Sequence, residues 1–370
     1  MAANVPDPTR ILSIQSHVVS GYVGNRSATF PLQLLGWDVD VTNTVQFSNH
    51  TGYGRWGGLR FDAEHLSDIF SALQNNGLLR YSRMLTGYMP SADVVKVVLH
   101  LVKKLRTRQG AEQEGGLIYL LDPVMGDMGR GMYVAPEVLP IYQEMLQYST
   151  IITPNQFEAQ ALTGIQVVDL TSLKQLIFTL HKRHKVPHVI ITSVELPDSD
   201  LHKIGAHRNL PDGQLAMLQV GSSCEIALDA SGQRKEPNVE LADLQIWFIQ
   251  FPEVQGYFSG VGDMFAALTL GRFNPDSNQD GTVHTNASKD NKPLTPIAKA
   301  SEMAIASLQG ILSNTCKVID ALERDFPIQT KADEAQQKVD TMRRRELRVV
   351  QSKNEIESPT IVYRAKWISA

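Results

Sequence analysis

Short apolar runs alternate with longer amphipathic segments through the first two hundred residues. The amphipathic segments show apolar residues at helical spacing and predict helices at Ala63–Leu73, Ala92–Leu105, Pro136–Leu146 and Leu170–His181. The apolar runs between them are too short to be buried helices and predict strands at Ile11–Ile14, Met84–Leu85, Leu117–Leu121, Ile151–Ile152 and Val189–Ile191. This alternation predicts an α/β fold, with a mostly parallel sheet covered by helices on both faces.

Polar residues follow most of these apolar runs at their carboxyl ends. They are Gln15-Ser16, Thr86-Gly87-Tyr88, Asp122-Pro123, Thr153-Pro154-Asn155 and Thr192-Ser193. In open α/β sheets, ligands bind outside the carboxyl ends of the strands. The pattern therefore indicates a ligand site at that edge, although a merely solvated edge would also be polar.

The second half of the chain has a different pattern. Residues 201–254 have short polar runs with turn signals, which favour antiparallel strands, and helical spacing returns at Gly262–Leu270 and Pro296–Leu312. Residues 274–292 are rich in Asn, Asp, Ser and Gly and predict a mobile surface loop. The charged stretch 331–348 predicts a solvated helix, and its Arg343–Arg345 cluster is interpreted as part of a solvated face rather than as an address signal.

Composition places the chain among soluble globular proteins. It has 370 residues, 42% of them apolar, and a formal net charge of −4, so nothing in its charge favours a nucleic-acid partner. Its two cysteines, Cys224 and Cys316, are far apart, which argues against a disulfide framework or a thiolate zinc site. We find neither a signal-peptide pattern nor an apolar run of about 20 residues, the length needed to cross a membrane. We therefore expect a cytoplasmic protein without a membrane segment, a nuclear location being left open.

The segment with the clearest chemistry is Ser259–Leu268, where two glycines precede an acidic residue and an apolar helix. Gly260 and Gly262 permit tight backbone turns, so successive N–H groups at a helix N-terminus can converge on an anion. Neither a P-loop nor the dinucleotide pattern Gly-x-Gly-x-x-Gly occurs here.

Asp263 follows these glycines and has two interpretations. Aspartate is a preferred residue at helix N-termini, so a capping role needs no catalysis. With a phosphoryl group on the neighbouring N–H groups, however, the carboxylate would be placed to accept a proton from an attacking hydroxyl.

Six motifs in order along the chain resemble the pyridoxal kinase branch of the ribokinase-like superfamily. Gly260–Asp263 is similar to the superfamily's Gly-Thr-Gly-Asp motif. The other five are Ser13–Val18 with Gly21–Arg26, Val45–Tyr53, Leu85–Tyr88, Asp122–Asp127 and Ile151–Glu158. The tail Val349–Lys353 also resembles animal members. The resemblance covers nearly the whole chain and implies one ribokinase-like three-layer α/β/α sandwich over residues 1–370, with residues 331–370 as a C-terminal extension.

The resemblance implies ATP-dependent phosphorylation of the 5′-hydroxyl of pyridoxal, pyridoxine and pyridoxamine in vitamin B6 salvage. Asp263 would be the catalytic base and Gly260, Val261 and Gly262 would supply backbone N–H groups. The vitamin would be bound by Asp263 and by seven residues with hydroxyl, imidazole, aromatic or apolar side chains. These seven are Ser16, Val23, Val45, Phe47, His50, Thr51 and Tyr88. For Val45 and Phe47 alone, strand packing would be the simpler explanation.

The resemblance also implies a nucleotide and two kinds of cation. The ATP site would include residues from five loops, namely Asp122, Asn155, Glu158, Thr192, Ser193, Val254, Gln255, Gly256 and Val261. A monovalent cation, K⁺ or Na⁺, would lie near Asp122, Thr153 and Thr192, and Mg²⁺ near Asp127 and Glu158. Asn155 and Glu158 also fit a helix capping box, and both roles are compatible.

A glycine-rich flap over the site is implied at Met125–Tyr133, including Gly126, Gly129, Arg130, Gly131 and Tyr133. The flap is shorter than in animal members. Val261 stands where the superfamily commonly has threonine, so we expect one fewer hydroxyl donor to phosphate but retained backbone donors.

Alternatives to this function stay open. A related hydroxymethylpyrimidine or sugar kinase would share the phosphate-binding residues, and a weakly active vitamin B6 binding protein would share the pocket. The family also implies a homodimer.

Overall fold

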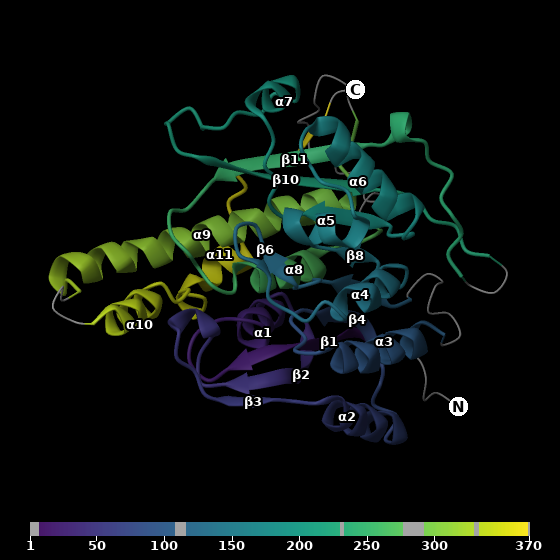
Figure 1. Ribbon diagram of the computed structural model, residues 1–370, viewed down its shortest axis with the longest axis horizontal. Helices are drawn as coiled ribbons and strands as arrows, with labels where there is room; N and C mark the ends of the chain where they lie inside the picture. The colour runs from purple at the N-terminus through teal and green to yellow at the C-terminus, as the bar shows by residue number, and fades with distance from the viewer. Residues whose placement is uncertain (1–6, 108–115, 230–232, 277–291, 329–332, 369–370) are drawn as a thin grey trace.

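A ten-stranded sheet runs through the part of the chain that this computed structural model describes, which is residues 7–107, 116–229, 233–276, 292–328 and 333–368 (Figure 1). Its strands, in spatial order, are β12 (Lys366–Trp367), β11 (Ile246–Pro252), β10 (Ala216–Ser223), β9 (His188–Ile191), β8 (Ile151–Ile152), β5 (Ile118–Leu121), β4 (Tyr81–Thr86), β1 (Asp7–Val18), β2 (Asp38–Phe47) and β3 (Gly58–Arg60). The strands from β9 to β2 are parallel, whereas β10–β12 and β3 are antiparallel to their neighbours.

Each face of the sheet buries its own core. Along β1, Ile11 belongs to one core and Leu12 to the other, because successive strand residues point to opposite faces. One core contains side chains of α1 (Asn25–Leu34), α8 (Val261–Arg272), α9 (Pro296–Asp325) and α11 (Lys353–Glu357). The other contains side chains of α2 (Ala63–Asn75), α3 (Ala92–Arg106), α4 (Val138–Leu146), α5 (Gln156–Thr163) and α6 (Leu170–Lys182). The predicted three-layer α/β/α sandwich is therefore confirmed.

The remaining short elements lie in the connections between these layers. They are the helices α7 (Asp198–Lys203) and α10 (Glu334–Arg344), the 3₁₀ turns η1 (Thr51–Tyr53), η2 (Leu241–Asp243) and η3 (Val350–Ser352), and a separate hairpin of β6 (Gly126–Asp127) and β7 (Gly131–Met132). No helix in the described ranges combines the length and the apolar character needed to cross a bilayer.

The predicted strands and helices correspond to β1, β4, β5, β8 and β9 and to α2, α3, α4, α6, α8 and α9, with β5 and α4 beginning one and two residues later than predicted. The antiparallel strands expected in 201–254 are β10 and β11, and the charged helix is α10. Helix α1 has no strong pattern, because Pro31 lies inside it and polar Asn25 and Ser27 are among its buried residues. Most of the predicted loop at 274–292 lies outside the described residues.

The order of the strands fixes where loops from distant parts of the chain meet. Helix α1 leads from β1 to β2 on one side, whereas β4 pairs with the other side of β1 and is followed outward by β5, β8 and β9. In such sheets, ligands bind at the carboxyl ends of the strands where the order reverses. Ser16 near the end of β1 and Tyr88 after β4 flank that point.

Gly221 on β10 tests the packing of the antiparallel end of the sheet. It lies opposite Trp247 of β11, and a Cβ at this position would overlap the fully buried indole ring. We expect Gly221→Ala to lower the free energy of unfolding by about 1–3 kcal/mol, because an overpacked core must shift. Denaturant unfolding measures this. Gly57→Ala is the control, because no described atom lies within 4 Å of its added Cβ, and its change should stay within about 0.5 kcal/mol.

Candidate active site

Gly260 begins the loop that opens α8, and its conformation requires glycine. It is the N-cap residue of α8 with φ of 81°, a left-handed conformation that other residues rarely adopt. A Cβ here would overlap the carbonyl oxygen of Tyr22, and the Ser27 hydroxyl donates to the carbonyl of Gly260 over 2.8 Å. The loop is therefore packed directly on the β1–α1 loop, with the first N–H groups of α8 available for an anion.

Asp263, in the first turn of α8, does not cap its own helix. Its Oδ2 accepts a hydrogen bond of 2.7 Å from the backbone N–H of Gly24, in the β1–α1 loop. Gly24 also has positive φ, 51°, and a Cβ on it would overlap the backbone of Ser16. Burial raises the pKa of Asp263, while the Gly24 N–H acts in the opposite direction. The carboxylate thus bridges two glycine turns that are far apart in sequence.

Four residues predicted for the vitamin pocket form one apolar cluster at the ends of β1, β2 and β4. Val45 and Phe47 are buried together with Val18, and Val23 and Tyr88 pack against them. The cluster stands apart from the two large cores of the sheet. It lies next to the β1–α1 loop, because Val23 immediately precedes Gly24.

His50 and Thr51, the other vitamin residues after β2, have different environments. His50 is buried, and its Nδ1 lies 3.2 Å from the hydroxyl of Ser259, the residue before Gly260. Thr51 begins η1 and is exposed. The structure therefore connects His50, but not Thr51, directly with Ser259–Asp263, the anion loop.

Asp122, Thr153 and Thr192 follow three adjacent parallel strands, β5, β8 and β9, so the sheet brings the predicted cation residues to one edge. Backbone hydrogen bonds connect the three loops. The Thr153 N–H donates to the carbonyl of Leu121 over 3.2 Å, and the Thr192 N–H donates to the carbonyl of Pro154 over 3.0 Å. Burial raises the pKa of Asp122, and the negative charges of Glu158 and Asp263 raise it further, while the Thr153 hydroxyl lowers it. The carboxylates of Glu158 and Asp263 thus both lie close enough to Asp122 to repel its negative charge.

Glu158 and Asn155 form the expected capping box at the start of α5. Both oxygens of the buried Glu158 carboxylate accept backbone hydrogen bonds, of 2.8 Å from Met125 and 2.9 Å from Asn155. Burial raises the pKa of Glu158 in spite of these donors. The Asn155 amide donates to the carbonyl of Gly126 over 2.7 Å and to Asp127 over 3.4 Å. These bonds fasten the flap hairpin to the N-terminus of α5.

The flap predicted from its glycines is the β6–β7 hairpin. Gly129 and Gly131 have positive φ at its turn, Gly126 packs against the Phe157 ring, and Tyr133 is half-exposed. The Arg130 guanidinium lies 4.3 Å from the centre of the Tyr257 ring. Tyr257 closely follows the predicted nucleotide residues Val254, Gln255 and Gly256, so this contact links the flap to that segment.

Within the described residues, no group of three or more His, Cys, Asp and Glu side chains is arranged to hold a metal ion by itself. Asp122, Asp127 and Glu158 carry carboxylate oxygens, the kind of ligand that Mg²⁺ prefers beside water and phosphate.

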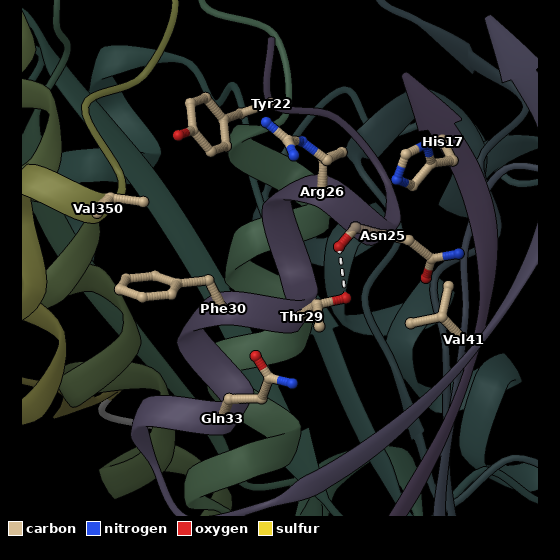
Figure 2. A pocket seen from close by; sticks show the side chains of 9 residues that line it. All are labelled: His17, Tyr22, Asn25, Arg26, Thr29, Phe30, Gln33, Val41 and Val350. Atoms are coloured by element: carbon tan, nitrogen blue, oxygen red, sulfur yellow. Dashed lines mark hydrogen bonds between the residues drawn. The ribbon is translucent and has the colours of Figure 1, made fainter. Parts of the chain in front are cut away.

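A separate cavity of about 390 Å³ lies along one face of α1 (Figure 2). Its lining comes from β1, β2, α1 and the C-terminal segment, and comprises His17, Tyr22, Asn25, Arg26, Thr29, Phe30, Gln33, Val41 and Val350. None of the residues predicted for the vitamin, nucleotide or cations lines it.

Comparison with known proteins identifies the family of the chain. The phosphomethylpyrimidine kinase family profile matches residues 62–210. The pyridoxal kinase of Bos taurus is 35% identical over 360 residues, covering 96% of this chain and 97% of that protein. The chain belongs to the pyridoxal kinase family. The Arabidopsis thaliana pyridoxal kinase is 34% identical over 361 residues, covering 97% of this chain and 95% of that one.

Solved structures from the pyridoxal kinase family share the fold. The pyridoxal kinase from Leishmania donovani, in complex with ADP and pyridoxine, superposes with a TM-score of 0.71 at 29% identity, covering 98% of this chain and all of that one. The enzyme from Trypanosoma brucei has a TM-score of 0.67 at 30% identity, with 98% and 100% coverage.

Two residues of this candidate site were missed in the sequence. Gly24, the partner of Asp263, lies in a pair of glycines before a helix, the same signal that drew attention to Gly260. Glu346, which contacts His50, gives no local signal because its partners are about three hundred residues away. The Arg343–Arg345 cluster is a solvated face only in part: Arg343 is exposed, whereas the Arg345 guanidinium lies near Gly256 and the Phe258 ring.

We expect Glu158→Gln to destabilise the protein. A glutamine has one acceptor oxygen, so the Met125 or the Asn155 N–H would lose its buried partner, at a cost of about 1–3 kcal/mol in the free energy of unfolding. Denaturant unfolding measures this loss. Glu323→Gln, on an exposed part of α9, is the matched control and should change little. Equal stability of the two variants would contradict a clamp that uses both oxygens.

Proposed function

We propose that the protein transfers the γ-phosphoryl group of ATP to the 5′-hydroxyl of pyridoxal, and also of pyridoxine and pyridoxamine, forming pyridoxal 5′-phosphate in vitamin B6 salvage. The observation that carries the proposal is the hydrogen bond between Asp263 and Gly24. It holds an acidic side chain from the first turn of α8 against Gly24, which directly follows Val23 of the apolar cluster. Full-length relatedness to pyridoxal kinases supports the same acceptor.

Asp263 is proposed as the general base. It would accept the proton of the 5′-hydroxyl while the hydroxyl oxygen attacks the γ-phosphorus in line with the departing ADP oxygen. The N–H groups of Gly260, Val261, Gly262 and Asp263 would stabilise the charge that spreads over the phosphoryl oxygens. Since Val261 has no hydroxyl, the backbone supplies these donors.

We propose that the nucleotide lies between the flap and the carboxyl ends of β5, β8 and β9. Its phosphates would face Thr192, Ser193 and Asn155, and its adenosine the 254–256 segment. Glu158 would act by fixing the backbones of Met125 and Asn155, since both its oxygens are already used there. Arg130 lies on Tyr257 in this structure and would add positive charge if the flap carried it towards phosphate.

Cations fit the charge of this site. Asp122, Glu158 and Asp263 raise the local negative potential, and triphosphate binding would raise it further. We propose that Asp122, Thr153 and Thr192 hold K⁺ or Na⁺, and that Asp127, with Asp122 and Glu158 nearby, holds Mg²⁺ through water and phosphate. The cations would offset phosphate charge during transfer.

The same resemblance leads us to propose that residues 1–370 act as one kinase domain in a cytoplasmic homodimer.

A substrate panel tests the acceptor. We expect ATP-dependent turnover of pyridoxal, pyridoxine and pyridoxamine with Mg²⁺, faster with K⁺ than without a monovalent ion, and much slower turnover of hydroxymethylpyrimidine and ribose. The profile match to phosphomethylpyrimidine kinases makes hydroxymethylpyrimidine the sharpest competitor. Faster turnover of that compound would overturn the assignment, and vitamin binding without ADP release would favour a binding protein.

Asp263→Asn tests the base. The amide oxygen can still accept the Gly24 N–H, so the fold should be retained, whereas kcat should fall about 10²–10⁴-fold.

In the unaltered protein, a base must be deprotonated to act, so activity is lost as pH falls through its pKa. Burial raises the pKa of Asp263, which places this loss at higher pH than for an exposed aspartate. Asp68→Asn on exposed α2 should leave the kinetics unchanged. Near-normal turnover by Asp263→Asn would sink the general-base role.

A further inference from the structure

Glu346 belongs to the C-terminal segment, two residues after the end of α10, yet its carboxylate lies among the loops of the active site. One oxygen, Oε2, accepts a hydrogen bond of 3.0 Å from the backbone N–H of Tyr22. The other, Oε1, accepts one of 2.9 Å from the Tyr53 hydroxyl and lies 3.3 Å from Nε2 of His50. The Glu346 side chain is only 11% exposed. One carboxylate therefore joins the β1–α1 loop to the segment after β2.

Both ends of this contact lead to the anion loop. Tyr22 is two residues before Gly24, whose N–H holds Asp263, and the carbonyl of Tyr22 is the atom that excludes a side chain at Gly260. His50 reaches the same loop from the other side through Ser259. The position of the catalytic loop is thus linked to Glu346 by two independent routes.

The charge on Glu346 also determines how His50 is oriented. A carboxylate only accepts hydrogen bonds, so Nε2 of His50 must carry the proton that faces Glu346. In the neutral imidazole, Nδ1 then accepts the hydrogen bond that the Ser259 hydroxyl donates. Without the carboxylate, nothing at Nε2 would favour this tautomer over the opposite one.

We propose that Glu346 is a positioning residue for phosphoryl transfer, which holds the vitamin-binding loops after β1 and β2 in register with the loop that carries Asp263. The inference rests on the proposed function. It assigns to the C-terminal segment a part in the site beyond packing.

Three further observations support it. Burial by itself would raise the pKa of Glu346, but hydrogen bonds from His50, Tyr53 and Tyr22 lower it overall, so the group is ionised at neutral pH. Gly21, with φ of 97°, leaves the space that the carboxylate fills, because a Cβ there would overlap it. Helix α10 lies over η1, where Lys338 and Met342 approach Gly54 and Gly52.

Steady-state kinetics of Glu346→Gln tests the proposal. The substitution keeps the size of the side chain, removes its charge and replaces one acceptor by a donor. We expect kcat/KM for pyridoxal to fall about 10- to 100-fold, because small displacements of reacting groups have effects of this size. Both a higher KM for pyridoxal and a lower kcat should contribute, with the KM for ATP changed less than twofold.

Tyr53→Phe is the second variant, since it removes one donor and keeps the ring. It should change the same two constants in the same direction but less, and its effect in the Glu346→Gln background should be smaller than alone, because the two groups share one interaction. Glu355→Gln is the matched control. Glu355 is a partly buried glutamate of the same C-terminal segment that accepts from Asn314 over 2.9 Å, away from the vitamin loops, so its kinetics should stay normal.

The outcomes separate the two proposals. Kinetic constants within twofold of the unaltered protein in Glu346→Gln, or a loss of stability alone with normal constants for the folded enzyme, would overturn the positioning role. If the unaltered protein does not phosphorylate pyridoxal at all, the proposed function fails. Calorimetric titration with pyridoxal then still tests Glu346, since weaker binding by the variant is expected and equal binding would refute it.

Discussion

The hydrogen bond from the Gly24 N–H to the Asp263 carboxylate is the contact on which the arrangement of the site depends. It joins the loop after the first strand to the N-terminus of α8, 239 residues further along the chain. Both loops turn at a glycine with positive φ: a side chain at Gly260 would overlap the Tyr22 carbonyl of the opposing loop, and one at Gly24 would overlap Ser16 of β1. The same close approach leaves the first N–H groups of α8 for a phosphate and sets the acid beside them.

This arrangement of loops buries negatively charged side chains. Asp122, Glu158 and Asp263 all have raised pKa values, chiefly because they are buried, and for Asp122 also because the other two are near. Such a cluster opposes folding unless it is compensated. Both oxygens of Glu158 accept backbone hydrogen bonds that offset part of its burial, whereas Asp122 and Asp263 have fewer such donors and are suited to cations and to a reacting hydroxyl. Glu158, which holds the structure, thus has both oxygens hydrogen-bonded, whereas Asp122 and Asp263 keep oxygens for a ligand.

The edges of the site are held by contacts between segments that lie far apart in the sequence. Asn155 and Glu158 fasten the base of the flap, Arg130 rests on Tyr257, and Glu346 connects the loops after β1 and β2. The β6–β7 hairpin is therefore fixed at its base, and the cation–π contact of Arg130 near its turn adds only about 0.5–2 kcal/mol.

From the sequence, the layers of the fold could be predicted and one candidate catalytic segment could be singled out. Apolar spacing located β1, β4, β5, β8 and β9 and most of the long helices, because burial on a sheet or on a helix face imposes its own period. The glycines around Asp263 indicated an anion site because few other local structures need them. Sequence could not exclude a capping role for Asp263, or show that both oxygens of Glu158 are occupied, or place Glu346 beside His50. Those facts depend on which loops the strand order brings together, and contacts between residues hundreds of positions apart leave no local pattern.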